Sequence, residues 1–286
     1  TASHFGSHFL SMVHEPSPLQ GTLRLFQTEP ISLPYFETNA QHPNKLIFIP
    51  GLTDTMGVVP YLPSLASVLN DLEYSLIQFV KCSDLGGFGT SSLEGDAQEI
   101  AQLAEHLLTR SDSPCTGKLV LMGHSTGCQD VVTFLSKERL NLKTGQQILV
   151  HGGICQAPVS DSEYFDSHHG RQDSARELLS KSQEYVKKGL PGALLDRSHI
   201  FPVRTSVNGR GEGNSAAVLT PAFTAYRFAS LNGHHGDDDL FSSYLDSESI
   251  VRTLQPALHR APLLMLFGMK EYVHRANMAA NMHHQM

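Results

Sequence analysis

An α/β architecture, with a mainly parallel sheet covered by helices on both faces, is predicted by three observations. Short apolar runs alternate along the 286 residues with segments in which apolar residues recur at helical spacing. The strand-like runs are continuously apolar, which is typical of parallel strands buried on both faces. One of these runs ends in a sharp turn that leads directly into a helical pattern. With 40% apolar residues, the chain can bury a sizeable core as one large domain.

The first part of the expected sheet contains three strand-like runs. Residues 22–27 (TLRLFQ) have the pattern of an early strand, and residues 45–50 (KLIFIP) that of a buried strand ending in Pro-Gly. Residues 58–70 then carry apolar residues at helical spacing after a start that contains proline. Residues 74–82 (YSLIQFVKC) are the next expected strand.

The second part continues the alternation. A helix at 94–109 follows the loop SDLGGFGTSS, which lacks the spacing of a nucleotide-binding loop. A strand at 118–122 and a helix at 126–138 come next, followed by strands at 146–158 and 262–268. Strands that alternate with helices favour a parallel sheet.

The alternation is interrupted between residues 160 and 245. This region is polar and rich in Gly and Ser, with one amphipathic helix expected at 172–188. It has too few apolar runs for a core of its own. We therefore expect residues 1–286 to form a single domain in which residues 160–245 are an insertion, or cap, over one end of the sheet.

Composition excludes several classes of partner. The formal net charge is −7, so binding to nucleic acid or to an anionic membrane surface is not expected. No apolar stretch approaches the length of a membrane span, and the N-terminus has no signal-peptide pattern. The four cysteines are isolated and form no CxxC pair, as is typical of a reducing compartment, so a cytoplasmic location is expected.

Residues 118–135, KLVLMGHSTGCQDVVTFL, have the pattern of a nucleophile elbow. The run predicts a strand, a sharp turn with Ser125 at its apex, and a helix. Gly123 and Gly127 flank the serine and leave room for neighbouring elements to pass close. Such a turn exposes the serine oxygen for acyl transfer, and we expect Ser125 to have a positive φ.

An oxyanion hole is expected beside this serine. The stretch FIPGLTDT (48–55) is an apolar strand that opens into Pro-Gly, and Leu52 follows. The backbone N–H groups of Leu52 and Thr126 would then share the oxyanion that forms during acyl transfer. This chemistry requires no cofactor and no metal.

Seven stretches of the chain resemble, in order, a family of α/β-hydrolases from fungi, plants and protists. That family is mostly of unassigned function and includes fungal esterases that open hydroxamate siderophores. The stretches are FIPGLTDT, VPYLPSLA, GFGTSSLEGDAQEI, LMGHSTGCQDVV, GGICQAPVSD, TAYRFASL and GDDDLFSS. The resemblance implies an α/β-hydrolase fold with Ser125 as nucleophile, and ester or related acyl hydrolysis without a cofactor. From the chain itself we expect the insertion to follow the sixth strand and the substrate to be a small-molecule ester, for which a siderophore-type ester is one candidate.

The carboxylate of a catalytic triad is ambiguous. The resembling family has a lysine, an aspartate and a glutamate before YVP, whereas this chain reads FGMKEYVH, with Lys270 at the aspartate position. Glu271 lies in the expected loop and is one candidate acid. Asp161, in APVSD, follows the preceding strand and is the other candidate.

The histidine of the triad has no clear match. His283 and His284 are the candidates, although both lie on an expected surface helix. We expect that a C-terminal strand and a histidine-bearing loop are missing from this sequence, in which case the true base lies beyond Met286. The alternative hypothesis is a catalytically silent, hydrolase-like binding protein with an incomplete triad.

The remaining histidines are weaker candidates for chemistry. His124 is expected to pack under the elbow. The pairs His168-His169 and His234-His235 lie in the insertion, the second pair beside GDDD. A structural or substrate-facing loop is the preferred interpretation of that motif over a metal site.

Overall fold

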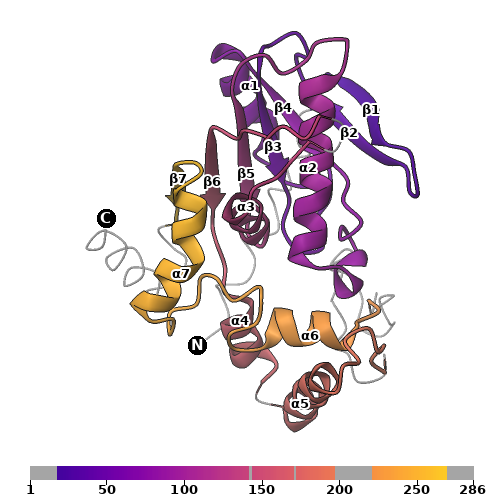
Figure 1. The fold of residues 1–286 in the computed structure, drawn as a ribbon, viewed down its shortest axis with the longest axis vertical. Helices are drawn as coiled ribbons and strands as arrows, with labels where there is room; N and C mark the ends of the chain where they lie inside the picture. The colour runs from indigo at the N-terminus through magenta and orange to yellow at the C-terminus, as the bar shows by residue number, and fades with distance from the viewer. Residues whose placement is uncertain (1–17, 142–143, 171, 197–220, 269–286) are drawn as a thin grey trace, which may run out of the picture.

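The computed structural model describes residues 18–141, 144–170, 172–196 and 221–268. Among them, seven strands form one sheet in the order β1-β2-β4-β3-β5-β6-β7 (Figure 1). The pairs β1–β2 and β2–β4 are antiparallel, and all other pairs are parallel. The strands are β1 (Thr22–Gln27), β2 (Leu33–Glu37), β3 (Asn44–Ile49), β4 (Tyr74–Phe79), β5 (Leu119–His124), β6 (Gly152–Gln156) and β7 (Leu263–Leu266).

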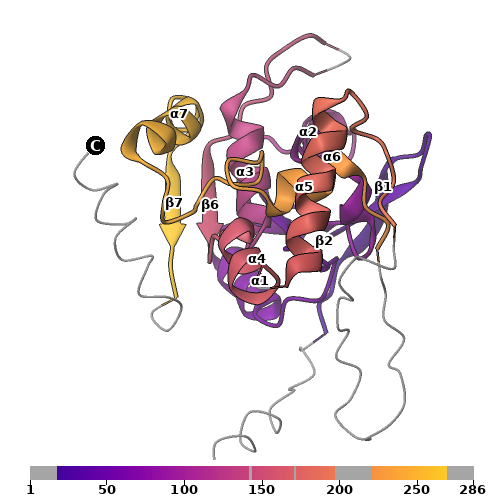
Figure 2. The ribbon, with the colours of Figure 1, turned by 90° about the horizontal axis from the view of Figure 1, so that it is seen from below.

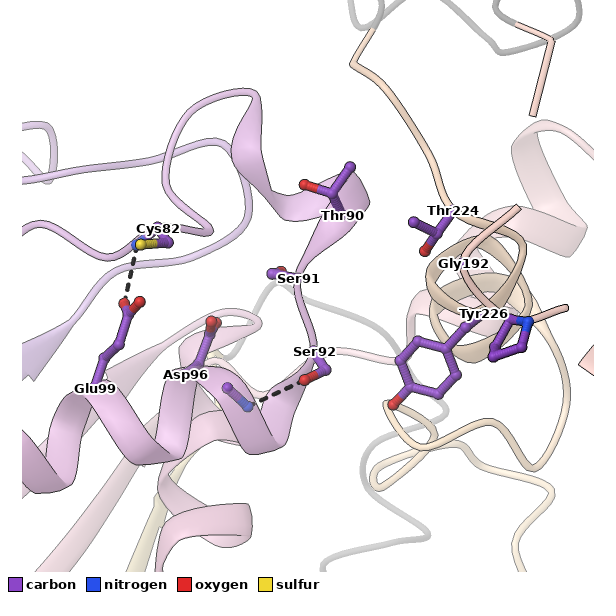
Figure 3. A pocket seen from close by; sticks show the side chains of 11 residues that line it. Cys82, Thr90, Ser91, Ser92, Asp96, Glu99, Gly192, Thr224 and Tyr226 are labelled. Carbon is purple, nitrogen blue, oxygen red and sulfur yellow. Dashed lines mark hydrogen bonds between the residues drawn. The ribbon is translucent and has the colours of Figure 1, made fainter. Parts of the chain in front are cut away.

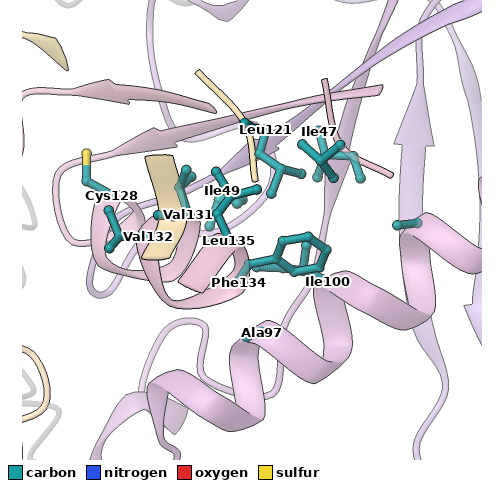
Figure 4. Packing of buried hydrophobic residues seen from close by; sticks show 14 of the residues in the cluster. Ile47, Ile49, Ala97, Ile100, Leu121, Cys128, Val131, Val132, Phe134 and Leu135 are labelled. Atoms are coloured by element: carbon teal, nitrogen blue, oxygen red, sulfur yellow. The ribbon is translucent and has the colours of Figure 1, made fainter. Parts of the chain in front are cut away.

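Helices cover both faces of the sheet. Helix α1 (Leu62–Asp71) packs against β4 on one face, while α2 (Leu93–Thr109), α3 (Gly127–Ser136) and α7 (Ser247–Leu258) pack together on the other. Side chains alternate between the two faces along each strand, as the pleat requires. In β3, Leu46 contributes to the cluster under α1 and Ile47 to the cluster under α2 and α3. Figure 4 shows this second cluster, in which side chains of α2 and α3 meet those of β3 and β5.

The expected α/β class is confirmed, with three differences in detail. Strand β2 was not expected, because Pro34 and the charged Glu37 count against a strand in a sequence pattern. Glu37 is nevertheless buried, since Lys45 and Arg110 pair with it. The strand expected at 146–158 is shorter, and the helix expected from residue 58 begins at Leu62, with Pro63 in its first turn.

The segment after β6 carries α4 (Asp161–His168), α5 (Asp173–Lys187) and α6 (Ala225–Asn232). Figures 1 and 2 show these helices beyond the end of the sheet at which the parallel strands finish. They share a small apolar cluster with Phe88, which lies in the 3₁₀ helix η1 (Gly87–Thr90), and Leu52 packs against that cluster. The insertion is therefore joined to the main body through the loops that follow β3 and β4.

Candidate active site

Ser125 lies at the turn between β5 and α3. Strand β5 ends at His124 and helix α3 begins at Gly127, so Ser125 occupies the apex. Its φ is +54°, which is uncommon for a residue other than glycine and confirms the expected backbone conformation. A sharp turn of this kind holds the Oγ clear of the strand, at the carboxyl end of the sheet.

The glycines of GHSTG are required by close backbone contacts. A Cβ built on Gly123 would lie 2.2 Å from the carbonyl oxygen of Gly127. A Cβ built on Gly127 would lie 2.4 Å from the carbonyl oxygen of Ile49, in β3. The elbow can pack against its own helix and against β3 only because neither position carries a side chain.

The loop after β3 lies directly against the serine. A Cβ built on Gly51 would be 3.0 Å from Ser125 Cβ and 3.5 Å from Ser125 Oγ. Among the described residues, the backbone N–H groups of Leu52 and Thr126 donate to no acceptor. Both N–H groups belong to the loop and the turn that meet at the serine, where an oxyanion would need donors.

A hydrogen-bonded layer supports the elbow from below. The Ser125 N–H donates to the Gln156 carbonyl oxygen at 3.0 Å, which ties the turn to the end of β6. His124 Nδ1 lies against Gln156 Oε1, and Tyr61 OH donates to the same oxygen at 3.1 Å. Burial raises the pKa of Tyr61 to about 12, so its hydroxyl stays a donor at neutral pH. His124 therefore has partners beneath the turn, as expected.

Asp161 is at the start of α4, and a hydrogen bond connects it to the helix that follows Ser125. Gln129 Nε2, one turn after Ser125, donates to Asp161 Oδ2 at 3.0 Å. Burial, and then the nearby charge of Asp238, raises the pKa of the Asp161 carboxyl well above its usual value. A carboxyl that tends to be neutral is less suited to stabilising an imidazolium.

The other triad candidates, Glu271, His283 and His284, lie outside the described residues, as does the region after β7. Within the described ranges, Ser125 Oγ makes no hydrogen bond to a histidine or a carboxylate. The structure thus brings together Ser125, Leu52 and Thr126, and places Asp161 one side chain away from α3.

A buried network of charges beside the elbow was not anticipated from the sequence. Lys81 Nζ, just after β4, donates to Asp130 Oδ2 at 2.6 Å and to Asp96 Oδ2 at 3.1 Å. Ser83 Oγ donates to the same Asp96 oxygen at 2.7 Å. Burial alone would lower the pKa of Lys81, but the two carboxylates raise it above its usual value. A lysine at the end of a continuously apolar strand was the available signal in the sequence.

A cavity of about 560 Å³ lies between the main body and the insertion. Figure 3 shows hydroxyl side chains on both of its sides, from the start of α2 and from the start of α6. Asp96 and Glu99 add carboxylates, and the described residues of the lining include no lysine, arginine or histidine. The lining residues are Cys82, Thr90, Ser91, Ser92, Gly95, Asp96, Glu99, Pro191, Gly192, Thr224 and Tyr226.

The histidines of the insertion have protein partners. His234 Nε2 lies 2.6 Å from Asp166 Oδ2, and its ring stacks on Tyr244. His168 stacks on Tyr164. In the ranges that the structure covers, no group of three or more His, Cys, Asp or Glu side chains is arranged to hold a metal ion.

A mainly parallel sheet, a serine elbow after β5 and a loop after β3 that packs on the serine together define the α/β-hydrolase class. Strand β6, the sixth of the described strands, directly precedes the segment that carries α4, α5 and α6. Of the helices described, none has the length and apolar character needed to cross a bilayer.

Within that class, the chain belongs to the family described as "Protein of unknown function (DUF1749)", which it matches over residues 12–284. It is 30% identical over 279 residues to "Esterase AN6793" of Emericella nidulans, a match covering 86% of this chain and 72% of that protein. It is 28% identical over 282 residues to "Fusarinine C esterase sidJ" of Aspergillus fumigatus, covering 87% and 77% of the two chains.

A solved structure gives a similar result. The "Siderophore hydrolase EstB from Aspergillus fumigatus" superimposes with a TM-score of 0.68 at 27% identity, covering 93% of this chain and 83% of that one. The resemblance inferred from the sequence motifs is confirmed. The protein is a hydrolase of the α/β-hydrolase fold.

Proposed function

We propose that the protein is a serine esterase that cleaves a small-molecule ester through an acyl-Ser125 intermediate. One observation carries this proposal: Ser125 has a positive φ at a strand–helix turn, and the loop of Gly51 and Leu52 lies against it. A serine in this setting presents its oxygen to a carbonyl carbon, while the backbone N–H groups of Leu52 and Thr126, which donate to no acceptor among the described residues, would bind the developing oxyanion.

The reaction would follow the two steps of acyl transfer. Ser125 Oγ bonds to the ester carbonyl carbon as a base takes its proton, and the N–H groups of Leu52 and Thr126 bind the oxyanion. The carbon–oxygen bond to the alcohol then breaks, and the alcohol takes the proton. Water hydrolyses the acyl-serine in the same manner. His283 or His284 is the proposed base, and Glu271 or Asp161 the proposed acid.

Two of the relatives suggest the first substrates to test. One of them is named a siderophore hydrolase and the other a fusarinine C esterase. A siderophore-type ester is therefore the substrate class that we propose for the first assays, alongside simple carboxylic esters.

A fluorophosphonate probe tests the proposal directly, because it labels only an activated serine. We expect labelling of the full chain, loss of labelling in Ser125→Ala, and retention in Ser247→Ala, whose serine is exposed at the start of α7. A folded wild-type protein that is not labelled would contradict the proposal and favour the silent, ligand-binding alternative.

A further inference from the structure

A small cavity lies directly beside the proposed oxyanion hole. Gly51, Leu52 and Thr126 form one side of it, and residues from the β4 loop, α2, α3 and the insertion form the others. Its volume is about 20 Å³, which is room for a single water-sized group. Its charged lining residues are Lys81, Asp84, Asp96, Asp130, Arg227 and Asp238.

Both cations of this lining are already engaged by carboxylates. Lys81 Nζ binds one oxygen each of Asp130 and Asp96. Arg227 Nη1 lies 2.7 and 2.6 Å from the two oxygens of Asp238. With all carboxylates ionised, four negative charges face two positive ones, so the described residues of the lining have a formal charge of −2.

One carboxylate oxygen in this lining has no partner. Asp130 is only 2% exposed, and its Oδ1 makes no hydrogen bond within the described part of the chain. A buried carboxylate oxygen without a donor is costly, and such atoms are rare in folded proteins. Asp130 lines this cavity, so the surplus charge of the described lining and the unpaired oxygen both favour a positively charged donor as its ligand.

We propose that this cavity binds a primary ammonium group carried by the acyl chain of the ester that Ser125 cleaves. The inference rests on the proposed function for its substrate, while the site itself is defined by the cavity. An ammonium nitrogen is about the size of a water molecule and donates three hydrogen bonds. A guanidinium or a trimethylammonium group is too large for a volume of about 20 Å³.

The raised pKa values of two carboxyl groups in the lining agree with this assignment. Burial, opposed by Lys81 and assisted by Asp96, raises the pKa of Asp130 to about 7. Burial also raises the pKa of Asp84 to about 6. The other charged groups facing the cavity are Arg227 and Asp238. An ammonium group would replace the protons held there, so its binding should strengthen as the pH rises from 6 to 8.

The first experiment compares esters that differ only at the end of the acyl chain. Three esters of 6-carbon acids with the same alcohol would end in methyl, primary ammonium or trimethylammonium. In the wild type, kcat/KM for the ammonium ester should exceed that for the trimethylammonium ester by about tenfold or more, as expected for a charged hydrogen bond. Asp130→Asn should lose most of that ratio, whereas Asp173→Asn, which is fully exposed on α5, should keep it. Equal rates for the two cationic esters in the wild type would overturn the proposal.

A second experiment examines the site without turnover. In Ser125→Ala, methylammonium should raise the melting temperature at constant ionic strength, and tetramethylammonium should not. The rise should be smaller in the double variant with Asp130→Asn, or with Asp84→Asn if the former does not fold. Stabilisation by potassium equal to that by methylammonium would assign the cavity to free cations and overturn the proposal. Stabilisation of Ser125→Ala by methylammonium, together with a wild-type protein that has no esterase activity, would support the site and contradict the proposed function.

Discussion

The backbone of Ser125 is strained at the apex of its turn. A non-glycine residue in the left-handed region costs about 1–2 kcal/mol, and only the surrounding structure holds it there. Ser125→Gly should therefore be more stable than Ser125→Ala by about 1 kcal/mol, with esterase activity lost in both. Denaturant unfolding measures the difference.

The matched control is Ser67, which is exposed within α1. There the order should reverse, and alanine should be more stable than glycine by about 1 kcal/mol because glycine is unfavourable inside a helix. The same order at both positions would show that Ser125 is not strained.

Gly127 provides a steric test of the elbow. Gly127→Ala places a methyl group against the Ile49 carbonyl oxygen, and the backbone must shift at a cost of about 1–3 kcal/mol. Because β3 leads into the loop of Leu52, esterase activity should fall as well. Gly86→Ala is the control, since a Cβ there meets nothing within 4 Å and should change neither quantity.

For single residues, the sequence predicts a feature when a short stretch of neighbouring residues determines it. The turn at Ser125 and its glycines follow from one short motif, so its conformation was predicted correctly. The contact between Lys81 and Asp130 joins residues that are 49 positions apart, and no periodicity encodes it. The roles of Glu271, Asp161, His283 and His284 stay predictions.

Among the helices and strands, Lys81 acts as a cross-link between α2 and α3. Its ammonium group is buried between Asp96 and Asp130, so Lys81→Met would leave two carboxylates without their cation. Breaking a buried pair of this kind costs about 3–5 kcal/mol of unfolding free energy. Lys137→Met, which removes an exposed pair with Glu94, should cost at most about 1 kcal/mol. Equal losses in the two variants would contradict the cross-link.

The same network predicts how stability depends on pH. The folded-state pKa of Asp130 is raised from 3.8 to about 7, so the folded protein holds a proton that the unfolded chain releases in this interval. The unfolding free energy should fall as the pH rises from about 4 to about 7, and Asp130→Asn should flatten that decline. Urea titrations of both proteins across this interval measure the two slopes, and parallel slopes would exclude Asp130 as the source.

The strand–helix alternation could be predicted because buried parallel strands leave continuous apolar runs. Strand β2 could not, since its short length, its proline and its buried Glu37 resemble a loop in the sequence. What makes Glu37 compatible with a strand is its pairing with Lys45 and Arg110, and that pairing exists only in the folded protein.

Across the whole molecule, the proposed site and the buried cluster of Glu37, Lys45 and Arg110 lie at opposite ends of the sheet. The proposed site lies where the parallel strands end, on the side of the insertion helices α4, α5 and α6 (Figure 1). The cluster of Glu37, Lys45 and Arg110 lies at the other end, because Lys45 pairs in register with Ser75 and Leu119 near the starts of β4 and β5. A substitution in that cluster should therefore change the unfolding free energy and leave kcat/KM unchanged.

Glu37→Gln tests this separation. Glu37 is fully buried and accepts from Lys45 Nζ at 2.9 Å and from Arg110 Nη2 at 2.8 Å, so its loss leaves two buried cations unpaired. We expect a loss of about 3–5 kcal/mol in unfolding free energy, with kcat/KM per folded molecule unchanged at low temperature. Asp173→Asn, in an exposed pair with Arg176, should change neither quantity measurably. A large fall in kcat/KM for Glu37→Gln, in protein shown to be folded by circular dichroism, would mean that the two ends of the sheet are coupled.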